Sequence, residues 1–296
     1  MDITQQLAQE FGLKQEYSQN IINLLDEGCT IPFIARYRKE MHGTCDDQTL
    51  REFADRLKYL RNLNDEKAKV EKAITEQGKW TDELKVALEN AKTLTEVEDI
   101  YRPYKPKRKT RASVAIAKGL EPLADLLQMQ SKSVTFAAEA EKFITEEVPT
   151  VNDAIQGAMD IVAERVSDNA ELRKELRALL ENKAIIKSEL IEGENSATYE
   201  TYAGFKQEVK NIPSHRILAL NRGEKEKCLK VEIEINPELT MKVIYSYFKK
   251  NNPDTDAIME ATLADAYDRL LFPSLERECR TNLTERASEQ AIKMFE

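Results

Sequence analysis

Positive charge in this chain is concentrated in one segment, residues 102–118, where it could neutralise a polyanion. These seventeen residues hold seven Lys or Arg and no Asp or Glu. Without those seven charges the formal net charge of the chain, −9, would be −16. Such an asymmetry is typical of a local surface that binds phosphates, because the acidic remainder of the chain repels them. A solvated loop without a specific ligand has the same composition, and that alternative stays open.

Two prolines set the conformation of this segment. Pro103 and Pro106 disfavour a helix, because proline lacks a backbone donor and restricts the residue before it. We therefore expect an extended, exposed loop whose cations contact a nucleic-acid backbone and whose aromatic ring stacks on a base. The candidate residues are Lys105, Lys107, Arg108, Lys109 and Arg111 for the phosphates and Tyr104 for the stacking contact.

A second group of candidates surrounds the phrase Ile-Pro-Ser-His-Arg at residues 212–216. Pro213 can begin a helix that Gly223 ends, and the free N–H groups of a helix N-terminus favour an anion. The candidates for such a site are His215, Arg216 and Arg222. In the structural alternative Ser214 caps the helix and His215 bonds a nearby carbonyl. Three further cations would extend the basic surface if folding brings them close to it: Arg36, Arg38 and Lys39.

The residue types give little support to catalysis. Ser214 and His215 are the one tempting nucleophile and base, but neighbours in a helix point in different directions. The chain has neither a P-loop nor a G-x-G-x-x-G motif. With only two histidines, acid–base chemistry would rest on carboxylates that are mostly solvated on helical faces. We therefore expect no enzymatic activity, no cofactor and no small-molecule substrate.

Metal binding and membrane insertion are also disfavoured. His42 and Cys45 have a metal-like spacing with Cys29 nearby, but no fourth ligand is evident, so no metal site is predicted. The four cysteines form no C-x-x-C pair, which fits reduced thiols of the cytosol. No apolar run approaches the roughly 18 residues of a membrane span, and the first residues do not read as a signal peptide. A cytoplasmic protein with no membrane partner is expected.

Helical periodicity covers most of residues 1–190 and 254–296 and predicts a mainly α fold. The longest pattern starts at Asp46–Asp47 and ends at Gly78, a helix of about 31 residues and about 46 Å. Thr95 and Glu98 are spaced as a capping box for the short helix before the basic segment. Asp168 and Glu171 repeat that spacing further along the chain.

The remaining segments complete a three-part organisation. Two short helices, residues 113–117 and 120–127, are broken at Gly119 and resemble a helix-turn-helix, although such pairs are common in helical proteins. They belong to a multihelical domain over residues 1–190. Residues 191–250 predict a small mixed α/β subdomain, because apolar residues alternate strictly with charged ones from Leu229 to Ile235. Residues 251–296 predict helices broken at Pro273.

Long phrases of the chain resemble the N-terminal region of the bacterial Tex family, transcription accessory proteins related to a eukaryotic transcription elongation factor. One position departs from the family's usual phrase LYLPYKPKRRTRA, because Arg102 stands where the family has an apolar residue. The matching phrases are TIPFIARYRKEMHG, LREFADRLKYLRNL, TLTEVEDIYRPYKPKRKTRA, AKGLEPLADLL and IPSHRILALNRGEKEKCL.

The resemblance implies a helix-turn-helix unit in this region. It also implies three further parts beyond residue 296: an RNase-H-like domain, a helix-hairpin-helix region and a C-terminal OB-type RNA-binding domain. Residues 251–296 would then be a helical connector toward the RNase-H-like domain.

Two functions follow for a chain of this kind. The first is a nucleic-acid-binding module that holds the RNA or DNA backbone with weak sequence preference, since phosphate contacts do not read bases. The second is a helical platform that docks components of the transcription machinery and binds little nucleic acid itself. A binding assay with RNA and DNA over a salt series separates the two.

Overall fold

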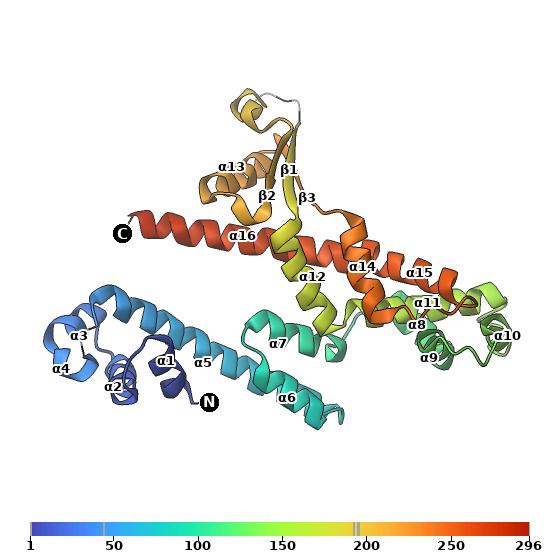
Figure 1. Ribbon diagram of the computed structural model, residues 1–296, viewed down its shortest axis with the longest axis horizontal. Coiled ribbons are helices and arrows are strands. Elements are labelled where there is room, and N and C mark those ends of the chain that lie inside the picture. Colours follow the sequence, from blue (N-terminus) through green and yellow to red (C-terminus); the bar gives the residue numbers. More distant parts are fainter. Residues whose placement is uncertain (1, 44, 192, 194–195, 296) are drawn as a thin grey trace. The chain divides into compact units, whose positions relative to one another are not determined.

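The computed structural model describes residues 2–43, 45–191, 193 and 196–295, which form a mainly helical protein with one small antiparallel sheet (Figure 1). The chain divides into two units, residues 1–104 and residues 105–296. The sequence-based boundaries near 190 and 250 do not coincide with this division. One continuous core runs through the second unit from Ala112 to Ala287, so helices on both sides of those boundaries share it.

A single long helix organises the first unit. Asp46 begins it by accepting a hydrogen bond from Thr49 N at 2.7 Å, and Gly78 follows its end with φ of +67°. Its 30 residues agree with the length expected from the sequence. The helices of this unit are α1 (Ile3–Glu10), α2 (Gln15–Asp26), α3 (Ile31–Tyr37), α4 (Lys39–His42), α5 (Asp47–Glu76), α6 (Asp82–Asn90), α7 (Leu94–Tyr101) and the 3-10 turn η1 (Arg102–Tyr104).

The long helix α5 connects two small cores. Its first half buries Leu50 and Phe53 among α1, α2 and α3, and its second half buries Val70 and Ile74 against α6 and α7. Because the apolar side chains follow helical spacing over its whole length, one rigid element can serve both clusters.

The capping box of α7 was predicted two residues too late. Thr93, not Thr95, begins the helix, and Glu96 accepts in return from Thr93 N. Two T-x-x-E phrases overlap here, so the spacing alone does not choose between them. The earlier start adds Leu94 to the apolar cluster between α5 and α7, which is the tertiary contact that selects it.

The second unit packs helices around a three-stranded sheet of order β2-β1-β3. Ile186 pairs with Ile233 in this sheet and both are buried, which confirms the strand predicted from the alternation after Leu229. Its elements are α8 (Arg111–Ala117), α9 (Glu121–Met129), α10 (Phe136–Glu141), α11 (Val151–Ser167), α12 (Ala170–Lys183), β1 (Ile185–Leu190), η2 (Ser196–Tyr202), β2 (Phe205–Glu208), η3 (Val209–Asn211), α13 (Ser214–Lys225), β3 (Leu229–Glu234), α14 (Pro237–Phe248), α15 (Asp256–Asp265), η4 (Ala266–Leu271) and α16 (Phe272–Phe295).

Two helix ends predicted in this unit are wrong. Gly223 does not stop α13. A Cβ there would lie 2.5 Å from Leu229 Cδ1, so the glycine lets β3 pack closely. Pro273 does not break the C-terminal helices either, because the helical backbone continues from η4 (Ala266–Leu271) through Pro273 into α16. A π-helical turn, η4, joins α15 to α16 just before it.

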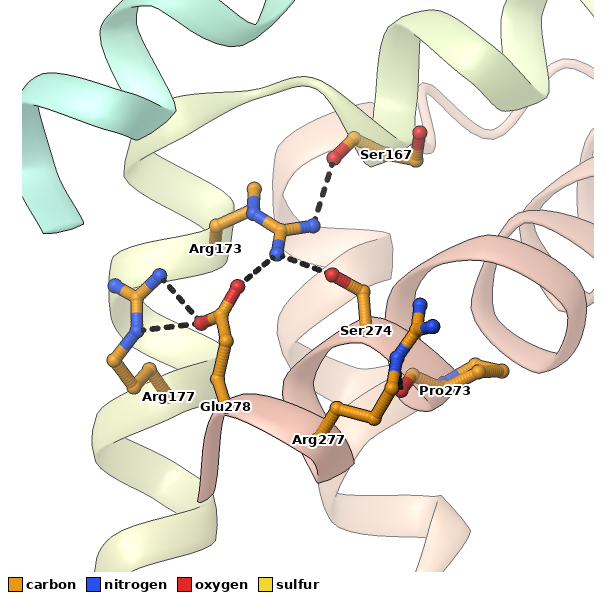
Figure 2. A network of polar contacts seen from close by, with 7 residues as sticks. All are labelled: Ser167, Arg173, Arg177, Pro273, Ser274, Arg277 and Glu278. Atoms are coloured by element: carbon orange, nitrogen blue, oxygen red, sulfur yellow. Dashed lines mark hydrogen bonds and ion pairs between the residues drawn. The ribbon is translucent and has the colours of Figure 1, made fainter. Parts of the chain in front are cut away.

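A buried ion pair fastens α12 to α16 (Figure 2). Arg173 has a side-chain exposure of 1% and donates to Glu278 Oε1 at 2.7 Å. The same guanidinium donates to Ser274 Oγ at 2.9 Å and to the Ser167 carbonyl at 3.3 Å. Arg177 donates to the second oxygen of Glu278 at 3.0 Å. The carboxylate is therefore shared by two guanidinium groups from one helix.

Candidate nucleic-acid interface

The basic loop, residues 105–110, is pinned to the unit that it begins. Lys107 Nζ contacts Asp168 and lies 3.6 Å from Glu164, both at the C-terminal end of α11. A cation stabilises that end of a helix, because the last carbonyls carry partial negative charge. At the other end of the loop, Thr110 and Ser113 cap α8 reciprocally at 2.8 and 3.0 Å. The loop therefore has a defined path between two fixed points.

Asp168 also explains a second wrong cap. The sequence predicted that it begins α12, but Asn169 does so by accepting from Leu172 N at 2.8 Å. Asp168 is instead the residue that ends α11, which leaves its carboxylate free to hold Lys107. The ion pair joins positions 61 residues apart, so no local pattern could have shown it.

The cations of the loop are not equivalent. Arg108 and Lys109 are exposed, and neither pairs with an acidic group among the described residues. Lys107 is neutralised by its two carboxylates, and Lys105 is half-buried with an interaction of its own. Arg111, the first residue of α8, is exposed. Three of the five predicted phosphate ligands are thus exposed, and for two of them, Arg108 and Lys109, no interaction with an acidic group is found among the described residues.

Arg111 interacts electrostatically with Asp265. Hydrogen bonds from Arg269 hold the pKa of Asp265 below its usual value, and the charge of Arg111 adds to that effect. Tyr104 belongs to the first unit, where its ring packs beside the α5–α7 core and its carbonyl accepts from Gln77 at 2.9 Å. The ring is half-buried, so part of its surface is already used for packing.

The predicted anion site on α13 is largely occupied by internal contacts. Arg216 donates to Gln207 Oε1 at 2.8 Å and lies over the Phe205 ring at 5.5 Å. Arg222 pairs with Glu226 at 2.9 Å. His215 remains exposed. The α13 candidates lie on different elements from the basic loop, because α13 packs on β3 and α16, whereas α8, which follows the loop, packs on α11 (Figure 1).

The structural alternative for this helix is also wrong in one detail. Ser214 does not cap α13, because its hydroxyl contacts Gln290 on α16 instead. The residue that precedes the helix is Pro213, which provides no side-chain acceptor.

The three cations of the first unit lie at the junction of α3 and α4. Arg36 and Lys39 are exposed, and Arg38 lies over the Phe33 ring at 5.4 Å. Phe33 and Tyr37 are exposed on the same short helix, with ring centroids 5.4 Å apart. Neither ring is among the functional residues predicted from the sequence. Their signal was available, since two aromatic residues four positions apart share a helical face beside basic residues.

His42, considered above as a metal ligand, holds this junction together. It is 1% exposed, and its Nε2 lies 3.1 Å from the Ile34 carbonyl. Among the described residues no group of three His, Cys, Asp or Glu side chains could hold a metal ion. Within the same residues, no helix has both the length and the apolar character of a membrane span.

The pair α8–α9 has the outline of a helix-turn-helix, with Gly119 at φ of +79° in the turn. Its second helix, however, exposes Glu121 and Asp125, which accept from Arg165 at 3.2 and 2.6 Å. A helix that enters a DNA groove needs donors or cations toward the phosphates and base edges. The acidic face of α9 therefore disfavours that use of the pair.

Comparison with known proteins identifies relatives along the whole chain. The family model "Tex-like protein N-terminal domain" matches residues 1–75, and "Tex central region-like" matches residues 131–295. The basic loop and α8–α9 lie between the two matched ranges.

Three relatives illustrate the range of similarity. The "Uncharacterized protein YdcI" of Bacillus subtilis is 42% identical over 99% of this chain and 42% of its own length. The "Transcriptional accessory protein Tex" of Neisseria gonorrhoeae is 39% identical over 100% of this chain and 40% of its own length. The human "S1 RNA-binding domain-containing protein 1" is 28% identical over 99% of this chain and 31% of its own length. The chain thus spans about two fifths of the length of these bacterial relatives.

Proposed function

The chain belongs to the Tex family, and on that basis we propose that it is a nucleic-acid-binding module of a transcription accessory protein. It holds the backbone of RNA or DNA with weak sequence preference and carries out no catalysis of its own. The relative from Neisseria gonorrhoeae is named for transcription, and the human relative is named for an RNA-binding domain. Both names support a partner that is nucleic acid, and work in transcription would place the protein in the cytoplasm.

The observation that carries the proposal is the state of the cations in the basic loop. Lys107 is neutralised and fixes the path of the loop, while Arg108 and Lys109 beside it keep their charge in solvent. A phosphate backbone releases counterions when such cations replace them, which favours binding without any contact to a base. Because the loop is already ordered before binding, it loses less conformational entropy when it binds.

Weak sequence preference follows from the same residues. Contacts to phosphates position a nucleic acid but carry no information about the bases. The helix pair α8–α9, which resembles a helix-turn-helix, presents carboxylates on its second helix, at Glu121 and Asp125. Discrimination among sequences is therefore not expected from α8–α9.

A double substitution tests the proposal. Arg108→Gln with Lys109→Gln should weaken binding to oligonucleotides of different sequence by one common factor, measured by fluorescence anisotropy at a fixed low salt concentration. The matched control is Lys132→Gln with Lys183→Gln, which removes the same charge from exposed positions outside the loop. The control should bind as the parent chain does, because only local cations contact the phosphates.

Two results would remove the proposal. One is a loss that is equal in the loop variant and the control, which would indicate an effect of net charge alone. The other is a parent chain that binds no oligonucleotide, which would favour the alternative function, a helical platform for proteins of the transcription machinery.

A further inference from the structure

Two aromatic rings of the first unit are exposed without an evident structural reason. Tyr37 has an exposure of 63% and Phe33 of 37%, although both lie on the short helix α3. Ile34, which follows Phe33 on this helix, is fully buried and anchors the helix to the core. Their ring centroids are 5.4 Å apart with an interplanar angle of 41°, so the two rings form one continuous surface. Exposed rings that do not stabilise the core are candidates for binding.

The surroundings of the rings are positive, in contrast to the rest of this unit. Residues 1–104 carry 20 Asp or Glu and 15 Lys or Arg. Arginines elsewhere in the unit are paired, as Arg56 is with Glu10 and Arg61 with Asp26, both at 2.7 Å. Arg36 and Lys39 have no such partner among the described residues. Glu40 is the one acidic residue of the α3–α4 segment, so a net positive charge remains there.

Arg38 connects the cations to the rings. Its guanidinium lies 5.4 Å from the centroid of the Phe33 ring, and one of its nitrogens lies 3.4 Å from the Tyr37 carbonyl. A guanidinium held against an aromatic ring offers its own flat face for stacking. The α3–α4 segment that carries Arg38 is held to the core side of α3, because the buried His42 ring joins α4 to the Ile34 carbonyl of α3.

We propose that Phe33, Tyr37 and Arg38 form a stacking platform for unpaired bases of a single-stranded nucleic acid, with Arg36 and Lys39 holding the adjacent phosphates. This inference relies on the proposed function for the class of partner, but it uses none of the residues of the basic loop. Bases stack on aromatic side chains and on guanidinium planes regardless of their sequence. In a duplex those faces are covered by the neighbouring base pairs, so the platform selects single strands.

The chemistry of the patch favours nucleic acid over a protein partner. An apolar groove for a protein helix needs several aliphatic side chains in contact with one another. Here two rings are surrounded by cations without carboxylate partners, a combination that matches a base beside a phosphate. A protein that docks on the rings is the competing occupant, and the experiment below separates the two.

The test measures how much the bases contribute to binding by the full 296-residue chain. The probes are a single-stranded oligothymidylate and an abasic oligomer of the same length, which keeps the phosphates and lacks the bases. The parent chain should prefer the oligothymidylate. Tyr37→Leu should weaken binding to the oligothymidylate about fivefold or more, because stacking on an aromatic ring is lost, and should leave binding to the abasic oligomer unchanged. Tyr37→Phe should keep the preference, because it retains the ring.

The outcomes distinguish this inference from the proposed function. Arg108→Gln with Lys109→Gln should weaken both probes by the same factor and preserve the ratio between them. A parent chain that binds both probes equally would overturn the stacking platform while leaving the phosphate-binding loop intact. A Tyr37→Leu variant that keeps the parent's preference would also overturn it and would leave the rings to a protein partner. A chain that binds neither probe would contradict both proposals. Far-UV circular dichroism should show unchanged helix content in every variant, since Tyr37 is mostly in solvent.

Discussion

Removing Glu278 should destabilise the second unit far more than removing an exposed carboxylate. The substitution Glu278→Leu leaves the Arg173 guanidinium buried, at 1% side-chain exposure, without the carboxylate that it contacts at 2.7 Å. The Ser274 hydroxyl and the Ser167 carbonyl that it also contacts carry no net charge, and Arg177, at 15% exposure, loses its contact with the same carboxylate. Breaking a buried ion pair in this way costs about 3–5 kcal/mol. Because Glu278 is itself 25% exposed, water reaches one side of the pair and the lower end of that range applies.

Urea denaturation measures this loss. A change of about 3 kcal/mol corresponds to a midpoint lower by about 1 M at the slopes usual for domains of this size. The control Glu234→Gln removes a carboxylate that is 56% exposed and 3.7 Å from Lys187, and should change the free energy of unfolding by less than about 1 kcal/mol.

A double substitution isolates the cause. Arg173→Met with Glu278→Leu also removes the more deeply buried of the two guanidinium groups that share the carboxylate, and should recover part of the stability lost in Glu278→Leu, since the charge at 1% exposure is gone. If Glu278→Leu unfolds at the same urea concentration as Glu234→Gln, the buried ion pair does not stabilise the second unit more than an exposed one does. A double variant that is less stable than Glu278→Leu alone would show that the buried charge of Arg173 is not the cause of the loss.

Two further outcomes are expected. Gly157→Ala should lower the free energy of unfolding by about 1 kcal/mol despite the better helix propensity of alanine, because the new Cβ would lie 2.3 Å from the Cδ1 of buried Leu120. A higher melting temperature of this variant in calorimetry would contradict the expectation. Hydrogen bonds from Arg269 lower the pKa of Asp265 in the folded chain below its unfolded value of about 3.8. The stability that this carboxylate contributes is therefore fully present above the unfolded pKa, and it is lost as the pH falls through the lower folded pKa. Asp265→Asn should therefore lose less stability than the parent between about pH 5 and pH 2 in urea titrations, and an identical pH profile would oppose the assignment.

The sequence predicts those elements whose signal repeats many times along the chain. The helix after Asp46 shows its apolar spacing over eight turns, and its observed 30 residues match the expected length. The strand from Leu229 alternates strictly and is found as β3. In both cases each residue supports the same assignment, so a single ambiguous position cannot change it.

The wrong predictions are those in which one residue had to decide alone. Gly223 resembles a residue that ends a helix, but it allows Leu229 of β3 to pack closely against α13, a contact that only the folded structure shows. Pro273 resembles a residue that breaks a helix, yet the helical backbone continues through it from η4 into α16. Glycine and proline each permit more than one structure, and tertiary packing selects among them.

The candidate interface divides in the same way. The cluster of cations at residues 105–111 is evident in the composition, but the composition cannot show that Lys107 is neutralised by Asp168. Pairing across 61 positions depends on the fold of α11 and α12. The exposed state of Tyr37 likewise depends on which face of α3 is buried, and only the structure shows this for so short a helix.

The most direct test of the phosphate-binding loop is the slope of log affinity against log salt concentration. On single strands each phosphate contact contributes about −0.7 to that slope. Arg108→Gln with Lys109→Gln should therefore flatten it by about 1.4, whereas the control Lys132→Gln with Lys183→Gln should leave it as in the parent chain. A loop variant that keeps the parent's slope would contradict the account, because the two cations left free by the fold would then make no contact with the backbone.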